Sequence, residues 1–376
     1  MERRVLYCEV DFLKNLVMGF SKYSFDEQRR SLQIIELLSI SPIVFNSKEK
    51  LYSDEELKNH AIFNYISKRS LENNIGEHRW SYDHFSDFSN TPQSNELFSI
   101  LLTTKSELDC NRIMKKWGIL AFNNYTLLKY EHLFQDCGTA LPDTKIKLGW
   151  KSILGYKYSN ICNSIILIDN YLLQSDVKQT YANKSVKEKI NNNLIPILDA
   201  LLPKEISIPF HLYIIACEDS YPFKPLMDEE DDESLYSLIR GLRGGKVPIK
   251  IRLIHSKKMF HDRVILSNNI WISSGMGFDL FGEEHKSVSK PTTISVLFPF
   301  IQCSSPWIKT AYENVINLAQ RIAETHIGYG DLFVNRLLDW ETEEKMNNSS
   351  IPYTKSIDKN FNLHLLRHYN KIENVR

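Results

Sequence analysis

Short apolar runs, separated by polar turns and by helical stretches, recur along most of this chain. In the first part, the runs at residues 5–13, 98–102 and 119–122 predict strands. Between the last two, residues 107–117 have helical spacing and end before a glycine. A strand, helix, strand order predicts an α/β domain, which we place at residues 1–145.

The second part of the chain repeats this alternation with longer and more apolar strands. Residues 135–150, which contain two glycines and a proline, predict a linker before it. Beyond the linker, the pattern predicts a mixed sheet covered by helices, in a second α/β domain at residues 150–305. Helical spacing at 307–326 and 331–346 predicts a helical C-terminal extension over 306–376. The strands expected in the second domain lie at 164–168, 210–216, 249–254 and 292–298, and its main helices at 187–202 and 235–243.

The composition is that of a globular protein of ordinary charge. The 376 residues are 43% hydrophobic and 24% charged, with a formal net charge of +0. Zero net charge argues against bulk attraction to nucleic acid or anionic membranes, so any basic surface must be local. The six cysteines are scattered without metal-ligand spacing, which predicts buried free thiols. No apolar run approaches the roughly 20 residues of a membrane span, and the charged N-terminus is unlike a signal peptide, so we expect a cytoplasmic protein.

The sequence predicts a β-hairpin within residues 261–277, the segment that contains most of the candidate functional residues. The apolar runs at 264–266 and 270–272 flank the polar turn Ser267-Asn268-Asn269. An antiparallel pair returns the chain to its starting edge. His261, before the first run, should therefore lie beside the glycine-containing segment at residues 273–277.

The spacing of this segment resembles the phospholipase D superfamily motif H-x-K-x4-D-x6-G. The matching positions are His261, Arg263, Asn268 and Gly275, with every interval kept. Arginine stands where the family has lysine, and asparagine where it has aspartate. The HDR sequence and the later G-x-G-F-D segment most resemble the phospholipase D-like domain at the C-terminus of MIT-domain midbody proteins.

This resemblance implies a phosphodiester site that needs no metal cofactor. His261 would attack phosphorus, because a neutral imidazole is nucleophilic and titrates near neutral pH. Arg263 would hold phosphate oxygens bidentately, whereas Asn268 supplies no carboxylate. Ser274, Gly275 and Gly277 would bind phosphate where glycine lets it approach the backbone. Because the family uses two histidines around one phosphate, the single motif here implies a homodimer.

The first domain resembles a PIN-like nuclease domain in the order of its elements. This resemblance implies a Mg²⁺ or Mn²⁺ site for phosphodiester hydrolysis, since carboxylate oxygens are the ligands these ions prefer. Lys105 occupies the turn where such proteins usually place an acid. The alternative is a plain α/β domain whose acids cap helices. The acidic residues concerned are Glu9, Asp11, Glu107 and Asp109.

Three functional hypotheses follow from the sequence. The first is a nuclease, a phosphodiesterase-type hydrolase suited to antiviral defence or to a toxin effector. The second is a binding module that holds the phosphate of a nucleic acid, nucleotide or lipid headgroup without hydrolysis. The third is a scaffold. Neutral net charge weighs against the first, and the retained spacing at His261 weighs against the third.

Overall fold

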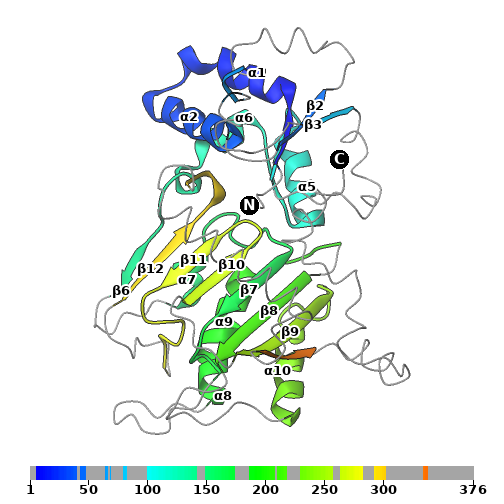
Figure 1. Ribbon diagram of the computed structural model, residues 1–376, viewed down its shortest axis with the longest axis vertical. Coiled ribbons are helices and arrows are strands. Elements are labelled where there is room, and N and C mark those ends of the chain that lie inside the picture. The colour runs from blue at the N-terminus through cyan, green and yellow to red at the C-terminus, as the bar shows by residue number, and fades with distance from the viewer. Residues whose placement is uncertain are drawn as a thin grey trace. The chain divides into compact units, whose positions relative to one another are not determined.

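The computed structural model describes residues 6–39, 43–47, 64–66, 68, 79–82, 100–141, 149–173, 186–207, 210–217, 229–256, 263–282, 292–301 and 333–337. The chain forms two compact units. The first comprises Met1–Asp136, Leu297–Glu313 and His364–Arg376, and the second Cys137–Val296 and Asn314–Leu363. Each unit contains its own sheet with helices packed against it, so the α/β fold class predicted from the sequence is confirmed (Figure 1).

The first unit is built on a five-stranded sheet in the order β3-β2-β1-β4-β5. All four strand pairs are parallel. Because sequence order reverses between β1 and β4, the carboxyl ends of these two strands form the topological switch point of the sheet. The strands are β1 (Leu6–Glu9), β2 (Ile43–Ser47), β3 (Arg79–Tyr82), β4 (Ile100–Leu102) and β5 (Leu120–Phe122), and the helices are α1 (Val10–Met18), α2 (Phe25–Ser39), α5 (Glu107–Trp117) and α6 (Asn124–Lys129), with 3₁₀ turns at Phe20–Lys22, Glu131–Leu133 and Pro299–Ile301.

The first strand is shorter than the sequence predicts. The apolar run at residues 5–13 divides into β1, which ends at Glu9, and α1, which begins at Val10. Val10 and Leu13 are buried at helical spacing, but a run this short, with acids at positions 9 and 11, fits the alternation of a strand equally well. Asp11 therefore lies in the first turn of α1 and is exposed, instead of ending a strand.

Helix α5 has the bounds that the sequence predicts. The Ser106 side chain accepts a hydrogen bond from the backbone N–H of Asp109 and caps the start of the helix. At its end Gly118 adopts φ 59°, the left-handed conformation that glycine takes without steric cost.

The second unit contains an eight-stranded mixed sheet in the order β13-β9-β8-β7-β10-β11-β12-β6. Strands β7, β8 and β9 run parallel, and β10 pairs antiparallel with β7. Apart from the predicted hairpin, which is described below, four of its strands have predicted counterparts and are confirmed: β7 (Ser164–Ile168), β8 (Phe210–Cys217), β9 (Ile249–Ser256) and β12 (Thr292–Leu297). The remaining elements are β6 (Thr139–Leu141), β10 (Arg263–Ser267), β11 (Trp271–Ser274), β13 (Phe333–Leu337), α7 (Trp150–Leu154), α8 (Val186–Lys189), the π-helical segment Ile190–Leu194, α9 (Ile195–Leu201) and α10 (Glu229–Gly241).

Both edge strands of this sheet differ from the sequence prediction. Strand β6 lies within the predicted linker and pairs with β12, and β13 replaces part of the predicted helix at 331–346 and pairs with β9. Neither segment has a strand pattern of its own, because the first contains turn residues and the second has helical spacing. Their conformation is set by the unpaired backbone groups at the edges of the neighbouring strands. The rest of the predicted C-terminal extension, residues 306–332 and 338–376, lies outside the described residues.

Two further expectations concern the cysteines and membrane-spanning segments. Cys8, Cys110, Cys137 and Cys162 are buried free thiols, as predicted. Burial raises the pKa of the Cys110 thiol to about 12, which keeps it protonated and unreactive. Across the described helices, none has the length and apolar character needed to cross a membrane.

Candidate functional site

The predicted hairpin is confirmed and sets the geometry of the candidate site. Strands β10 and β11 pair antiparallel, with Arg263 opposite Ser274 and Leu266 opposite Trp271. The open end of the hairpin therefore carries Arg263 and Ser274, with Gly275 next along the chain. His261 lies outside the described residues.

Arg263 is oriented by two neighbours at this open end. Its Nη1 donates a 3.2 Å hydrogen bond to the carbonyl oxygen of Gly275. Its guanidinium carbon lies 5.4 Å from the centroid of the Tyr171 ring, within cation–π range. The Arg263 Nε is buried and has no hydrogen-bond partner among the described residues, whereas Gly275 and Met276 are exposed. The site thus presents a fixed cation beside an exposed turn.

Asn268 lies at the other end of the hairpin, in the turn. It is 2% exposed, and its Oδ1 accepts a 2.9 Å hydrogen bond from the backbone N–H of Asn163. At about 3.4 Å per residue, the strand places Asn268 roughly 15 Å from Arg263. The structure therefore brings Arg263 together with Ser274 and Gly275, and it does not bring Asn268 to the same place.

The segment after β11 is held in a tight turn. The Ser274 hydroxyl donates a 2.5 Å hydrogen bond to the carbonyl oxygen of Gly277. Gly277 has φ 90°, and an added Cβ would lie 2.8 Å from Oδ2 of Asp169. Glycine is needed here both for its backbone conformation and for the space that the carboxylate fills. The Ser274 hydroxyl and the Gly277 carbonyl therefore bind each other in the turn.

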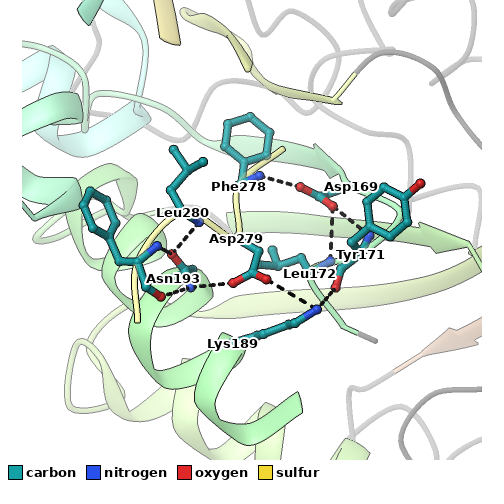
Figure 2. Close-up of polar contacts among 9 residues, drawn as sticks. Asp169, Tyr171, Leu172, Lys189, Asn193, Phe278, Asp279 and Leu280 are labelled. Carbon is teal, nitrogen blue, oxygen red and sulfur yellow. Dashed lines mark hydrogen bonds and ion pairs between the residues drawn. The ribbon is translucent and has the colours of Figure 1, made fainter. Parts of the chain in front are cut away.

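The side chain of Asp169 holds this turn in place through hydrogen bonds. The sequence did not identify it as a site residue. Its Oδ2 accepts a 2.6 Å hydrogen bond from the Phe278 N–H, and its Oδ1 accepts from the N–H groups of Tyr171 at 2.8 Å and Leu172 at 3.1 Å (Figure 2). The sequence signal for it was the acid that ends the fully apolar run of β7.

Asp169 is 1% exposed. Burial raises its pKa above the ordinary value, and the nearby carboxylate of Asp279 adds to this. The hydrogen bonds from Tyr171 and Phe278 and the charge of Arg263 oppose the rise in pKa. Arg263 and Asp169 therefore belong to one electrostatic cluster.

A second side chain, Asn193, holds the remainder of the turn. Its Oδ1 accepts hydrogen bonds from the N–H groups of Leu280 at 3.1 Å and Phe281 at 2.8 Å, and also from the Trp150 indole at 3.1 Å. Its Nδ2 donates to the Phe281 carbonyl at 2.9 Å and to Asp279 at 3.1 Å (Figure 2). A buried amide that makes five hydrogen bonds fixes the backbone conformation of residues 279–281.

Asn193 lies in the π-helical segment between α8 and α9. The helix predicted at 187–202 is confirmed, with Pro196 in the first turn of α9. Because proline has no N–H to donate, the wider π-turn before it keeps the chain helical. Helical periodicity gave no indication that Asn193 faces the core.

Lys189 completes the cluster as a buried cation. Its side chain is 1% exposed, and its Nζ lies 3.4 Å from Oδ2 of Asp279, whose side chain is 18% exposed. It also donates a 3.1 Å hydrogen bond to the carbonyl oxygen of Tyr171 (Figure 2). Lys189 thereby links the two segments that contact Arg263, the one after β7 and the one after β11.

In the first unit, Glu9 lies at the topological switch point. It is 3% exposed, and its Oε1 accepts a 2.6 Å hydrogen bond from the Thr103 hydroxyl. Its Oε2 accepts from the N–H and the hydroxyl of Thr104, both at 2.6 Å. Glu9 thus joins the carboxyl ends of β1 and β4.

The other predicted metal ligands have different surroundings. Asp109 accepts a 2.6 Å hydrogen bond from the Ser106 hydroxyl and lies 3.4 Å from Arg112, so it forms part of the cap of α5. Glu107 is exposed in the first turn of that helix, as Asp11 is in the first turn of α1. Within the described part of the chain, no three histidine, cysteine or acidic side chains form a group that could hold a metal ion.

No protein-family model matches the chain, and no curated protein matches it either.

Proposed function

We propose that this chain binds a phosphodiester at the open end of the β10–β11 hairpin and cleaves it with His261 as the nucleophile. The observation that supports binding is the arrangement of Arg263. Its guanidinium is oriented by the Gly275 carbonyl and the Tyr171 ring. Arginine presents five donors in a planar fork that matches phosphate oxygens.

The proposal for cleavage rests on sequence proximity. His261 precedes Arg263 by two positions in the sequence. A phosphate bound by Arg263 would therefore lie near the part of the chain that carries the imidazole. The imidazole nitrogen would form a bond to phosphorus while the bond to one ester oxygen breaks. Water would then hydrolyse the phosphohistidine, releasing the second product and the free histidine.

A homodimer is part of this proposal. The leaving oxygen needs a proton, and a second histidine at the same phosphate is a suitable general acid. The full four-position spacing occurs once in the chain, so the second imidazole would be His261 of another copy. Specific activity should therefore fall on dilution below the dissociation constant of the dimer.

The test uses the full chain with labelled DNA, labelled RNA and bis(4-nitrophenyl) phosphate, each with and without EDTA. We expect cleavage that survives EDTA, is lost in His261→Ala and is weakened in Arg263→Ala. Removing the nucleophile eliminates the covalent route. Removing the cation weakens binding of the substrate and of its transition state to a similar extent. Arg243→Ala is the control for a structural lesion, because Arg243 binds Asp199 and the carbonyl oxygens of Leu202 and Pro203 in the same unit.

Each other outcome contradicts a specific part of the proposal. Cleavage that persists in His261→Ala, or that EDTA stops, would point to the acids of the first unit. Binding of the probe without cleavage would leave a phosphate-binding module. Unchanged affinity in Arg263→Ala would mean that Arg263 does not bind the phosphate, and the proposed site would then be wrong.

A further inference from the structure

We infer that Asp169 is a positioning residue, whose carboxylate holds both of the groups that orient the Arg263 guanidinium. The inference rests on the proposed phosphate site and names the residue that prepares it. Asp169 itself would touch no phosphate. Its effect would pass through the two segments that its two oxygens bind.

The first connection runs through Tyr171. Oδ1 of Asp169 accepts hydrogen bonds from the N–H groups of Tyr171 and Leu172, which fixes the turn that follows β7. The Tyr171 ring leaves this turn and lies 5.4 Å from the guanidinium carbon of Arg263. The backbone position that Asp169 sets is thus the position from which the ring meets the cation.

The second connection runs through the turn after β11. Oδ2 of Asp169 accepts the hydrogen bond from the Phe278 N–H, and Gly277 leaves room for this oxygen. The Ser274 hydroxyl closes the same turn onto the Gly277 carbonyl. The Gly275 carbonyl that accepts from Arg263 belongs to this turn. Both contacts of the guanidinium therefore depend on opposite oxygens of one carboxylate.

A carboxylate suits this position better than an amide. Asp169 accepts three backbone N–H groups through two oxygens. Asparagine has one acceptor oxygen, and its NH₂ would face an N–H group on the other side. Asp169→Asn keeps the volume but must release either the Tyr171 segment or the Phe278 segment, so it disturbs one of the contacts of Arg263.

The experiment is a double-mutant cycle with bis(4-nitrophenyl) phosphate as the probe, its affinity measured by calorimetry on the full chain in a His261→Ala background, in which the proposed reaction cannot consume the probe. We expect Asp169→Asn to weaken binding about three- to tenfold, the effect of about one lost oriented contact. In an Arg263→Ala background the same substitution should change affinity less than twofold, because its effect passes through that guanidinium. Arg243→Ala shows how much a destabilising change elsewhere in the same unit alters affinity.

The outcomes separate this inference from the proposed function. If Arg263→Ala loses binding while Asp169→Asn retains the wild-type affinity, Asp169 is not a positioning residue and the phosphate site stands. If Asp169→Asn weakens binding equally in both backgrounds, its role is general support of the fold and the inference is wrong. If Arg263→Ala leaves affinity unchanged, the phosphate site fails, and the inference fails with it.

A second variant covers the case in which Asp169→Asn does not fold. Tyr171→Leu removes the ring beside the guanidinium and keeps the backbone N–H that binds Asp169. We expect it to weaken binding of the same probe about threefold, as the loss of a cation–π contact at a partly exposed site should. Wild-type affinity in Tyr171→Leu would overturn the inference.

Discussion

The carboxylate of Asp169 accepts a 2.6 Å hydrogen bond from the backbone N–H of Phe278, a residue 109 positions further along the chain. This contact joins the end of β7 to the turn that follows β11. It brings two sequence-distant segments together around Arg263, because β10 pairs with both β7 and β11. The arrangement makes several outcomes measurable.

Gly277 and Gly275 should respond very differently to the same substitution. Gly277→Ala forces a side chain into a φ of 90° and places its Cβ 2.8 Å from Asp169. We expect it to lower the free energy of unfolding by about 2 kcal/mol or more. At Gly275 the nearest atom to an added Cβ is the Thr292 hydroxyl at 3.5 Å, an ordinary contact. Gly275→Ala should cost less than about 1 kcal/mol, and equal losses in urea denaturation would contradict this assignment.

Removal of Asp279 from its ion pair with Lys189 should destabilise the fold more than removal of Lys189. Asp279→Ala removes the carboxylate that balances a cation only 1% exposed, and we expect a loss of about 3 kcal/mol in unfolding free energy. Lys189→Met removes the buried charge and keeps the length of the side chain. It should cost about 1 kcal/mol, because Asp279 is partly exposed and retains its hydrogen bond from Asn193.

A double variant checks the same pair. Asp279→Ala introduced into Lys189→Met should cost less than it does in the wild-type chain, since the uncompensated charge is then absent. Chemical denaturation of all four proteins measures the coupling. Additive losses would mean that the two charges do not interact.

Asp169 should impose a specific pH dependence on stability. Its pKa in the folded protein is raised, chiefly by burial, so between the ordinary aspartate value of about 4 and the raised value the folded state binds more protons than the unfolded state. The contribution of Asp169 to the unfolding free energy is therefore full below the ordinary value. It is lost as the pH rises through the raised pKa. The charges of Asp279 and Arg263 influence the same titration.

Unfolding curves of the wild type and Asp169→Asn, measured across acidic and neutral pH, isolate this contribution. We expect the stability of the wild type relative to the variant to fall as the pH rises. A relative stability that increases with pH would show that the hydrogen bonds to the carboxylate outweigh its burial.

In the first unit, Glu9 and Asp11 should differ sharply although both are acids near the end of β1. Glu9→Ala removes three hydrogen bonds from Thr103 and Thr104 and leaves the buried Thr103 hydroxyl and the half-buried donors of Thr104 without their acceptor, so we expect a loss of about 3 kcal/mol. Asp11→Ala, at an exposed position, should stay within about 0.5 kcal/mol of the wild type.

The metal hypothesis adds an expectation of its own for these two acids. If Mg²⁺ or Mn²⁺ binds through Glu9 and Asp11, millimolar Mn²⁺ should raise the thermal midpoint of the wild type but not that of Asp11→Ala. The same rise in both proteins, or in neither, would separate Asp11 from any metal site.

The sequence by itself determined the elements whose signals are local. Two short apolar runs on either side of the polar turn at 267–269 predicted the hairpin, and strand pairing confirms it. Helix α5 has its predicted bounds because Ser106 caps its start and Gly118 ends it. These signals lie within a few residues of the structure they specify, so no knowledge of distant partners was required.

Tertiary structure decided the elements and contacts that depend on distant partners. Strand β6 lies in a stretch that contains glycine and proline, and β13 lies in a run with helical spacing, so neither has a strand pattern of its own. They exist as the edges of a sheet whose inner strands pair with them. The division of the first run into β1 and α1 was not visible in the sequence, because the polar positions 9 and 11 fit the alternation of a strand, whereas the burial of Val10 and Leu13 and the exposure of Asp11 follow a helix.

The predicted site differs from the observed one for the same reason, namely that some of its contacts depend on residues distant in sequence. Spacing placed Arg263 and Gly275 together correctly, because a hairpin is a local structure. It grouped Asn268 with them, although the length of β10 holds that residue at the opposite end. Asp169 was visible only as the acid that ends an apolar run, and Asn193 gave no signal, because both meet the turn after β11 only when three separate segments pack. A buried polar side chain is identified by the distant backbone groups that it binds, and those partners are known only once the chain has folded.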